Sequence, residues 1–205
     1  MSYIYKYSVS NFKFCIVNPY HEYLNKISPI SEDTFNRFVK LCERKTVVAN
    51  TILAEAGKMP NKIYLLISGV LRAYITTEEG KDYNKRIYSP ISFGGALTSL
   101  IKKEPSKITF ESLTECDLFE IDYYGAMQLC DELEDAPKLY TRILEKAFIA
   151  YEDRNIDLMT LNGTQRYQKL LKQIPNIEEL IPQYQIASYL NVSPVQLSRI
   201  RKKLL

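Results

Sequence analysis

The period of the apolar residues changes along this chain, and that change limits the folds it can adopt. From residue 46 to residue 121, β-branched and aromatic residues come in short runs that are separated by turn signals at Gly57, Ser68-Gly69 and Gly80. Short strands at such even spacing are typical of a small antiparallel barrel or roll. We expect a tight hairpin at Ser68-Gly69, because glycine readily adopts positive φ.

On both sides of this region the apolar residues recur with the period of a helix. Ser31 has the features of a helix cap, and apolar residues then recur at helical spacing as far as Cys42. After Pro137, which suits a first turn, a helical pattern of about two dozen residues leads to a stop at Gly163. So long a helix with a narrow apolar stripe predicts a dimer seam, formed by Leu144, Phe148, Tyr151 and Leu158. The alternative is a helix that lies flat on the barrel.

The segment Gln183 to Leu205 has the pattern of a helix-turn-helix. Asn191 lies where a first helix must end in a left-handed residue, which asparagine tolerates well. Ser193 then caps a second helix, and Pro194 occupies its first position. The apolar faces that pack these helices together are expected to contain Ile186, Ala187, Leu190, Leu197 and Ile200.

The outward face of the second helix has the chemistry of a DNA-reading surface. Arginine pairs with guanine, glutamine pairs with adenine, and valine contacts the thymine methyl group. We therefore expect the bases to be read by Val195, Gln196 and Arg199. Contacts to the DNA backbone are expected from Ser193, Ser198, Arg201, Lys202 and Lys203. The net charge of the whole chain is only +3, so DNA binding must depend on this local concentration of charge.

Composition and residue spacing exclude several other classes of protein. Hydrophobic residues make up 46% and charged residues 25%, a balance typical of a globular protein. The only histidine is His21, and no cysteine pair has metal-ligand spacing, so we expect no metal and no cofactor. Reduced thiols are expected at Cys15, Cys42, Cys116 and Cys130. No catalytic constellation, signal peptide or membrane-length apolar run is present, which predicts a cytoplasmic protein that is not an enzyme.

The predicted roll, long helix and helix-turn-helix together resemble the cyclic-AMP receptor protein/Fnr (Crp/Fnr) family of bacterial transcription regulators. The resemblance runs from about Tyr20 to the end of the chain. It is strongest in residues 63–74, 79–81, 92–97 and 118–122 and in the C-terminal motif. Residues 181–205 are similar to the divergent helix-turn-helix of the Bacteroidetes branch.

The resemblance implies an α+β fold and a domain order. It implies a cyclic-nucleotide-binding-like, cupin-like jelly roll (20–136), a dimerisation helix (137–162) and a helix-turn-helix domain with little or no wing (163–205). Residues 1–19 are an extension to which we assign no function. The implied partners are double-stranded DNA and a second copy of the chain, with RNA polymerase and a small-molecule effector as further candidates. The alternative is a sensing or interaction module whose C-terminal helices bind a protein.

The resemblance weakens at the effector site. Family members that bind cyclic nucleotides use a glutamate for the ribose and an arginine for the phosphate. The corresponding pocket positions here are Phe93, Gly94, Gly95, Ala96, Ser106, Lys107, Tyr151 and Glu152. Ala96 replaces the glutamate, and Lys107 lacks the bidentate fork of an arginine. We therefore expect that cyclic AMP does not bind with useful affinity.

Overall fold

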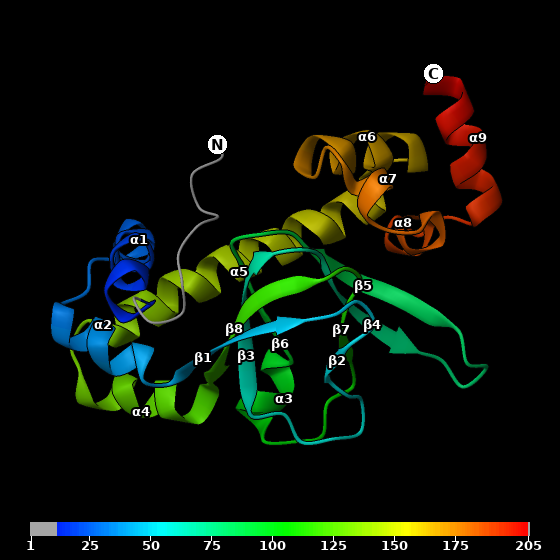
Figure 1. Cartoon of the computed structure of the whole chain (residues 1–205). Helices are drawn as coiled ribbons and strands as arrows, with labels where there is room; N and C mark the ends of the chain where they lie inside the picture. Colours follow the sequence, from blue (N-terminus) through cyan, green and yellow to red (C-terminus); the bar gives the residue numbers. More distant parts are fainter. Residues whose placement is uncertain (1–11, 205) are drawn as a thin grey trace.

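Two facing β-sheets form the centre of a computed structural model that describes residues 12–204 (Figure 1). Helices gather at both ends of this roll, and one long helix runs past the sheets from one group of helices to the other (Figure 1). Side chains are described for residues 20–204. The predicted α+β architecture, with an antiparallel roll followed by a long helix and C-terminal helices, is confirmed.

Each sheet contains four antiparallel strands. The strands are β1 (Cys42–Val47), β2 (Ile52–Ala54), β3 (Lys62–Ser68), β4 (Leu71–Thr76), β5 (Asp82–Tyr88), β6 (Ser92–Gly95), β7 (Thr109–Ser112) and β8 (Cys116–Asp122). One sheet has the order β1-β8-β3-β6, and the other has the order β2-β7-β4-β5. Alternate side chains of a strand point to the same face, so Leu66 and Leu118 of the first sheet and Leu71 of the second share one buried cluster in the space between the sheets.

The prediction of a hairpin at Ser68-Gly69 is wrong. Gly69 does have positive φ, +88°, but the strands on either side of it, β3 and β4, belong to different sheets. A Cβ at Gly69 would lie 2.2 Å from the carbonyl oxygen of Glu115, so glycine is required by a close backbone approach as well as by φ. The antiparallel neighbours of β4 are β7 and β5, and the turn between β4 and β5 contains Gly80, with φ +75°.

Two helices precede the roll. They are α1 (Phe12–Ile27) and α2 (Glu32–Val39). Ser31 caps α2 as predicted, because its hydroxyl accepts from the Thr34 amide at 3.1 Å. The helix ends earlier than predicted, since Cys42 already pairs with Ile121 in the first sheet. The expected N-terminal extension ends inside α1, and residues 1–11 lie outside the described residues.

The long helix α5 (Ala136–Thr160) follows α4 (Tyr123–Glu132), and α3 (Leu97–Lys102) lies between β6 and β7. Pro137 lies in the first turn of α5, as predicted. At its N-terminal end, Leu139 packs with Leu24 and Phe35 of the first two helices. Gly163 does not stop this helix: it is the first residue of the next helix, after the Asn162 cap.

The C-terminal helices are α6 (Gly163–Gln173), α7 (Ile177–Leu180), α8 (Gln183–Tyr189) and α9 (Pro194–Leu204). Their shared core contains the predicted Ile186, Ala187, Leu190 and Leu197, each at most 1% exposed. The same core includes Val70 and Ile87 of the roll. The helix-turn-helix is therefore packed directly on the second sheet.

Candidate DNA-reading surface and effector pocket

The turn between α8 and α9 has the geometry that the sequence predicted. Asn191 has φ +53°, in the left-handed region. The Val192 amide donates to the Ala187 carbonyl at 3.0 Å, which closes the end of α8. A Cβ at Gly163 would lie 2.9 Å from Cγ1 of Val192, so α6 can approach the turn closely because it begins with glycine.

A reciprocal cap holds the first turn of α9. The Gln196 amide donates to Ser193 Oγ at 3.1 Å, and the Ser193 amide donates to Gln196 Oε1 at 2.8 Å. Both side chains were predicted to contact DNA. The structure gives them a shared capping role, which the Ser-x-x-Gln spacing could have signalled.

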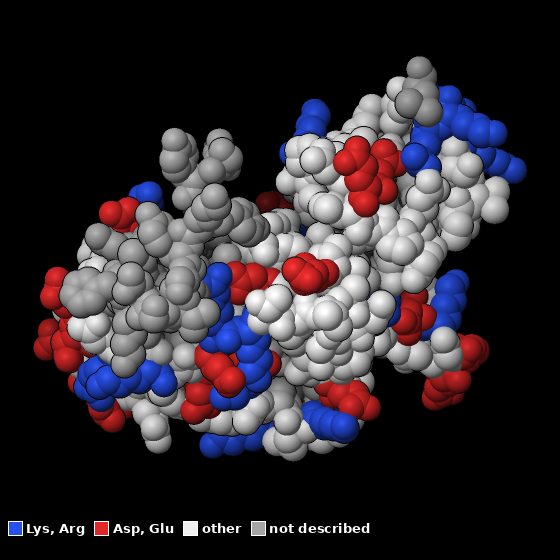
Figure 2. Space-filling view, viewed as in Figure 1, with Lys and Arg blue, Asp and Glu red and all other residues white. Residues whose placement is uncertain are grey.

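The outward face of α9 carries most of the predicted DNA-contacting residues. Val195 is 61% exposed. Also exposed are Gln196, Ser198, Arg199, Lys202 and Lys203. No acidic residue occurs between Pro194 and Leu205. Figure 2 shows blue Lys and Arg side chains gathered over the end of the molecule where α9 lies.

Arg201 differs from the other basic residues of α9. Its Nε lies 2.5 Å from Glu178 Oε1 on α7, and the same carboxylate accepts from the Tyr167 hydroxyl at 2.6 Å. Burial, followed by the hydrogen bond to Glu178, raises the pKa of Tyr167 to about 12. In this structure Arg201 therefore fastens α9 to the rest of the C-terminal helices.

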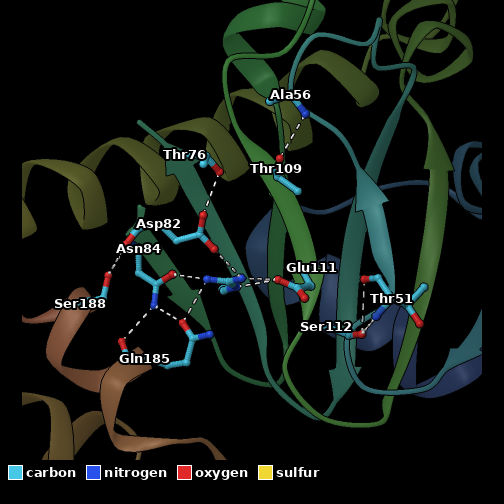
Figure 3. Close-up of polar contacts among 11 residues, drawn as sticks. Thr51, Ala56, Thr76, Asp82, Asn84, Thr109, Glu111, Ser112, Gln185 and Ser188 are labelled. Atoms are coloured by element: carbon cyan, nitrogen blue, oxygen red, sulfur yellow. Dashed lines mark hydrogen bonds and ion pairs between the residues drawn. The ribbon is translucent and has the colours of Figure 1, made fainter. Parts of the chain in front are cut away.

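A buried polar cluster fastens α8 to the roll (Figure 3). Arg72 on β4 is buried, and its Nε donates to Glu111 Oε2 at 2.7 Å. Its Nη2 donates to Asp82 Oδ2 at 3.0 Å, and its Nη1 donates to Gln185 Oε1 on α8 at 3.2 Å. A cation inside the roll therefore holds a side chain of the helix-turn-helix.

Asn84 on β5 completes this contact. Its Nδ2 donates to Gln185 Oε1 at 2.7 Å and to the Gln185 carbonyl at 2.9 Å (Figure 3). Its backbone amide donates to Ser188 Oγ at 2.9 Å. Gln185 is only 3% exposed, so loss of its partners would leave a buried amide unpaired. This cluster was not predicted, because its one local signal in the sequence is a charged residue inside the apolar run of β4.

An apolar cavity of about 310 Å³ lies between β6, α4 and α5. Of the predicted pocket residues, Phe93, Gly94 and Gly95 line it. Arg86 and Lys146 supply positive charge, and most of the remaining lining is apolar.

The other predicted pocket residues do not line this cavity. Ala96 is buried in the core with Phe110, and the Ser106 hydroxyl donates to the Ile108 carbonyl at 2.6 Å. Lys107 is exposed. Tyr151 and Glu152 are exposed as well. The structure thus brings together the β6 part of the predicted pocket and separates it from the rest.

The space beside Gly94 is filled by aromatic rings. A Cβ at Gly94 would lie 3.0 Å from the Tyr88 ring and 3.2 Å from the Phe110 ring. These two rings pack with their centroids 5.6 Å apart. The interior of the roll next to β6 is therefore occupied by side chains.

One face of α5 carries exposed apolar residues. Of the predicted seam, Phe148 is 62% exposed and Tyr151 is 52% exposed, whereas Leu144 and Leu158 are half-buried. Further exposed apolar residues on this helix are Ile149, Ile156 and Met159. Ile149 and Ile156 are seven residues apart, which is the repeat length of a coiled coil.

Cysteine and histidine take structural positions in the described residues. Cys116 is buried and Cys42 and Cys130 are half-buried, and none of the three forms a disulfide; the Cys15 side chain lies outside the described ones. His21 Nε2 lies 3.4 Å from the Ile30 carbonyl, and its ring packs on Phe35. Among the described side chains no group of histidine, cysteine or acidic residues could hold a metal ion. Within the same residues no helix is long and apolar enough to cross a membrane.

Comparison with known proteins identifies the roll. Residues 44–132 match the cyclic nucleotide-binding domain family. No curated protein sequence matches the chain significantly.

Similar solved structures cover most of the chain. One is CLP, the c-di-GMP-responsive global regulator of Xanthomonas campestris, with 21% identity and a TM-score of 0.65 over 85% of this chain and 91% of that chain. A crp/fnr family regulator from Eubacterium rectale has 16% identity and a TM-score of 0.67 over 85% and 83% of the two chains. FixK2 from Bradyrhizobium japonicum has 13% identity and a TM-score of 0.67 over 80% and 84%.

Proposed function

We propose that this chain, which contains a cyclic nucleotide-binding domain and has the fold of the Crp/Fnr transcription regulators, is itself a sequence-specific DNA-binding regulator of that type. The proposal rests mainly on α9, which has one buried apolar side and one exposed side without acidic residues. Leu197 is fully buried, whereas Val195 and Arg199 are exposed on a face without acidic residues. A recognition helix needs this division between a packed side and a base-reading side.

The regulator acts as a homodimer in this proposal. The exposed Phe148, Ile149, Ile156 and Met159 give α5 an apolar face along two heptads, which water would otherwise contact. Pairing two such helices places one helix-turn-helix on each side of a two-fold axis. A dimer of this kind reads a near-palindromic site.

The effector is not cyclic AMP. Ala96 provides no carboxylate for a ribose, and it is buried in the core of the roll. Ser106 is engaged with Ile108, and Lys107 is exposed away from the cavity beside β6. A buried cyclic phosphate would therefore lack the fork that compensates its charge.

Selection of DNA from a random pool tests the proposal. Purified protein is mixed with random duplexes at moderate salt, and the retained duplexes are sequenced. We expect enrichment of one inverted repeat, whose half-sites are separated by a whole number of helical turns. Recovery of duplexes without a shared sequence would contradict specific DNA binding, and recovery of a single half-site would contradict the dimer.

A further inference from the structure

A second cavity, of about 300 Å³, lies where the roll, the long helix and the helix-turn-helix meet. Arg86 of β5, Arg154 of α5 and Arg166 of α6 all line it. The end of α8 closes it with Tyr189 and Leu190. This cavity is separate from the predicted effector positions, since none of them lines it.

The lining carries an excess of positive charge. Beside the three arginines it contains Lys169, and its acidic residues are Asp153 and Asp157. Lys169 Nζ lies 2.6 Å from Asp157 Oδ2, so this pair is neutral as a whole. Among the described residues, none of the three arginines forms an ion pair with a carboxylate. Three guanidinium charges therefore face a single further carboxylate.

Backbone carbonyls hold two of these guanidinium groups in place. Arg154 donates to the Lys85 carbonyl at 3.0 Å and to the Tyr189 carbonyl at 2.7 Å, and it stacks on the Tyr189 ring. Arg166 donates to the Leu190 carbonyl at 3.0 Å and also to that of Leu161. A guanidinium has five N–H donors, so these bonds leave donors on each head. The backbone carbonyls therefore hold both guanidinium groups in place but carry no net charge that would neutralise them.

The positive groups are close enough to act on one another. Burial lowers the pKa of Arg154, and the charges of Arg166 and Arg86 lower it further, although Tyr189 opposes the change. Arginine stays protonated at neutral pH despite such shifts. The cost of keeping these charges together therefore falls when an anion enters the cavity.

We propose that this cavity binds a small phosphorylated anion, of mononucleotide size or smaller. Arginine forks match phosphate oxygens in a bidentate geometry. A volume of about 300 Å³ is at the lower end of the range of ligand pockets. Ile87, Leu170 and Ile174 give the cavity an apolar part that a sugar or base could contact.

Such a ligand would join the sensor roll to the DNA-binding helices. It would contact β5, α5 and α6 at once, next to the end of α8, and would favour the arrangement in which these elements lie together. This consequence for DNA binding rests on the function proposed above. The binding site itself does not.

Isothermal titration of the full-length protein, without DNA, tests the site. The probes are sodium pyrophosphate and 5′-AMP, each titrated separately. We expect both to bind the wild-type protein, and we expect Arg166→Gln to weaken binding about tenfold or more, the value of a hydrogen bond to a charged group. Asp153→Asn removes the remaining carboxylate charge and should tighten binding of both probes.

Arg166 also holds backbone carbonyls, so a second variant guards against loss of folding. Arg86→Gln removes a charge from the lining and breaks no described hydrogen bond, although Arg86 also lies over the Tyr88 ring and lines the cavity beside β6. It should weaken probe binding while the melting temperature stays near that of the wild type.

Lys146→Gln removes a charge from the cavity beside β6 alone and should leave probe binding unchanged. The matched control is Arg142→Gln, on the exposed surface of α5 beside Glu145, which should bind both probes like the wild type.

Three outcomes would overturn the proposal. The first is that neither probe binds the wild type at a probe concentration of about 5 mM, because a Kd above this value is too weak for a specific site. The second is equal binding by Arg86→Gln and Arg142→Gln. The third is loss of DNA affinity in Arg86→Gln and Arg166→Gln while both variants bind the probes like the wild type, which would assign the arginines to DNA phosphates. Probe binding by a protein that selects no DNA would instead contradict the proposed function and leave the site intact.

Discussion

Gln196 and Ser193 hold each other at the start of α9, where the Ser193 amide donates to Gln196 Oε1 at 2.8 Å. A glutamine that reads adenine needs both its side-chain oxygen and its Nε2 group. The Gln196 oxygen is turned toward the Ser193 amide in the cap, so a bidentate contact to adenine would compete with this bond. Sequence discrimination should therefore depend more on Arg199 than on Gln196.

Ser193→Ala should destabilise α9. The variant loses the hydroxyl that accepts from the Gln196 amide, and removal of such a cap costs about 1 kcal/mol. Urea unfolding measures the free energy, with Ser198→Ala, an exposed serine of the same helix, as the control. Equal stability of the two variants would show that the cap contributes nothing.

Gln185→Leu should weaken the attachment of the helix-turn-helix to the roll. It leaves donors of Arg72 and Asn84 buried without their partner, at a cost of about 1–3 kcal/mol. Gln183→Leu is the matched control, because Gln183 is an exposed glutamine on the same helix. We expect the urea midpoint of Gln185→Leu to be lower than that of Gln183→Leu, and identical midpoints would contradict a stabilising role for Gln185.

Ile156→Glu should convert the protein from dimer to monomer. The charge would enter the apolar face of α5, where Ile156 is 47% exposed in the single chain. Ile101→Glu on α3 is the control, since Ile101 is a comparably exposed isoleucine away from α5. Light scattering after size-exclusion chromatography gives the mass. A wild type that is monomeric, or an Ile156→Glu variant that stays dimeric, would rule out this seam.

Alkaline pH should destabilise the C-terminal helices through Tyr167. The folded-state pKa, about 12, is above the usual value of 10, so the folded protein retains a proton that the unfolded chain loses. The associated stability is complete below pH 10 and is lost as pH rises toward 12. Tyr167→Phe should therefore lose less unfolding free energy over this interval than the wild type, whereas Tyr184→Phe, at an exposed position, should follow the wild type. Parallel curves for all three proteins would refute the assignment.

Local signals allowed much of the fold and the geometry of the candidate DNA-reading surface to be predicted. Asn191, Ser193 and Pro194 act on the backbone within a few residues, so their pattern identified the turn and the start of α9 without knowledge of any distant contact. Gly69 shows where such reasoning stops. Its positive φ was predictable, but the sheet to which each neighbouring strand belongs depends on partners far along the chain.

The contacts between the roll and the helix-turn-helix could not be predicted for the same reason. Arg72 and Gln185 are 113 residues apart, and neither side chain has a pattern that names the other. The arginine cavity likewise combines β5, α5 and α6. For α5 the heptad spacing was visible, but its exposed face depends on how the roll covers the opposite side, so the exposed Ile149 and Ile156 were not among the predicted seam residues.

The most direct test of the account compares Arg199→Ala with Lys203→Ala on two duplexes. Fluorescence anisotropy at a fixed salt concentration gives the Kd of each protein for the selected inverted repeat and for a scrambled duplex. Arg199→Ala should lose about 1–3 kcal/mol of discrimination between the duplexes, whereas Lys203→Ala should weaken binding to both about equally. A wild type that binds both duplexes with the same Kd, or two variants with the same discrimination, would contradict a base-reading role for α9.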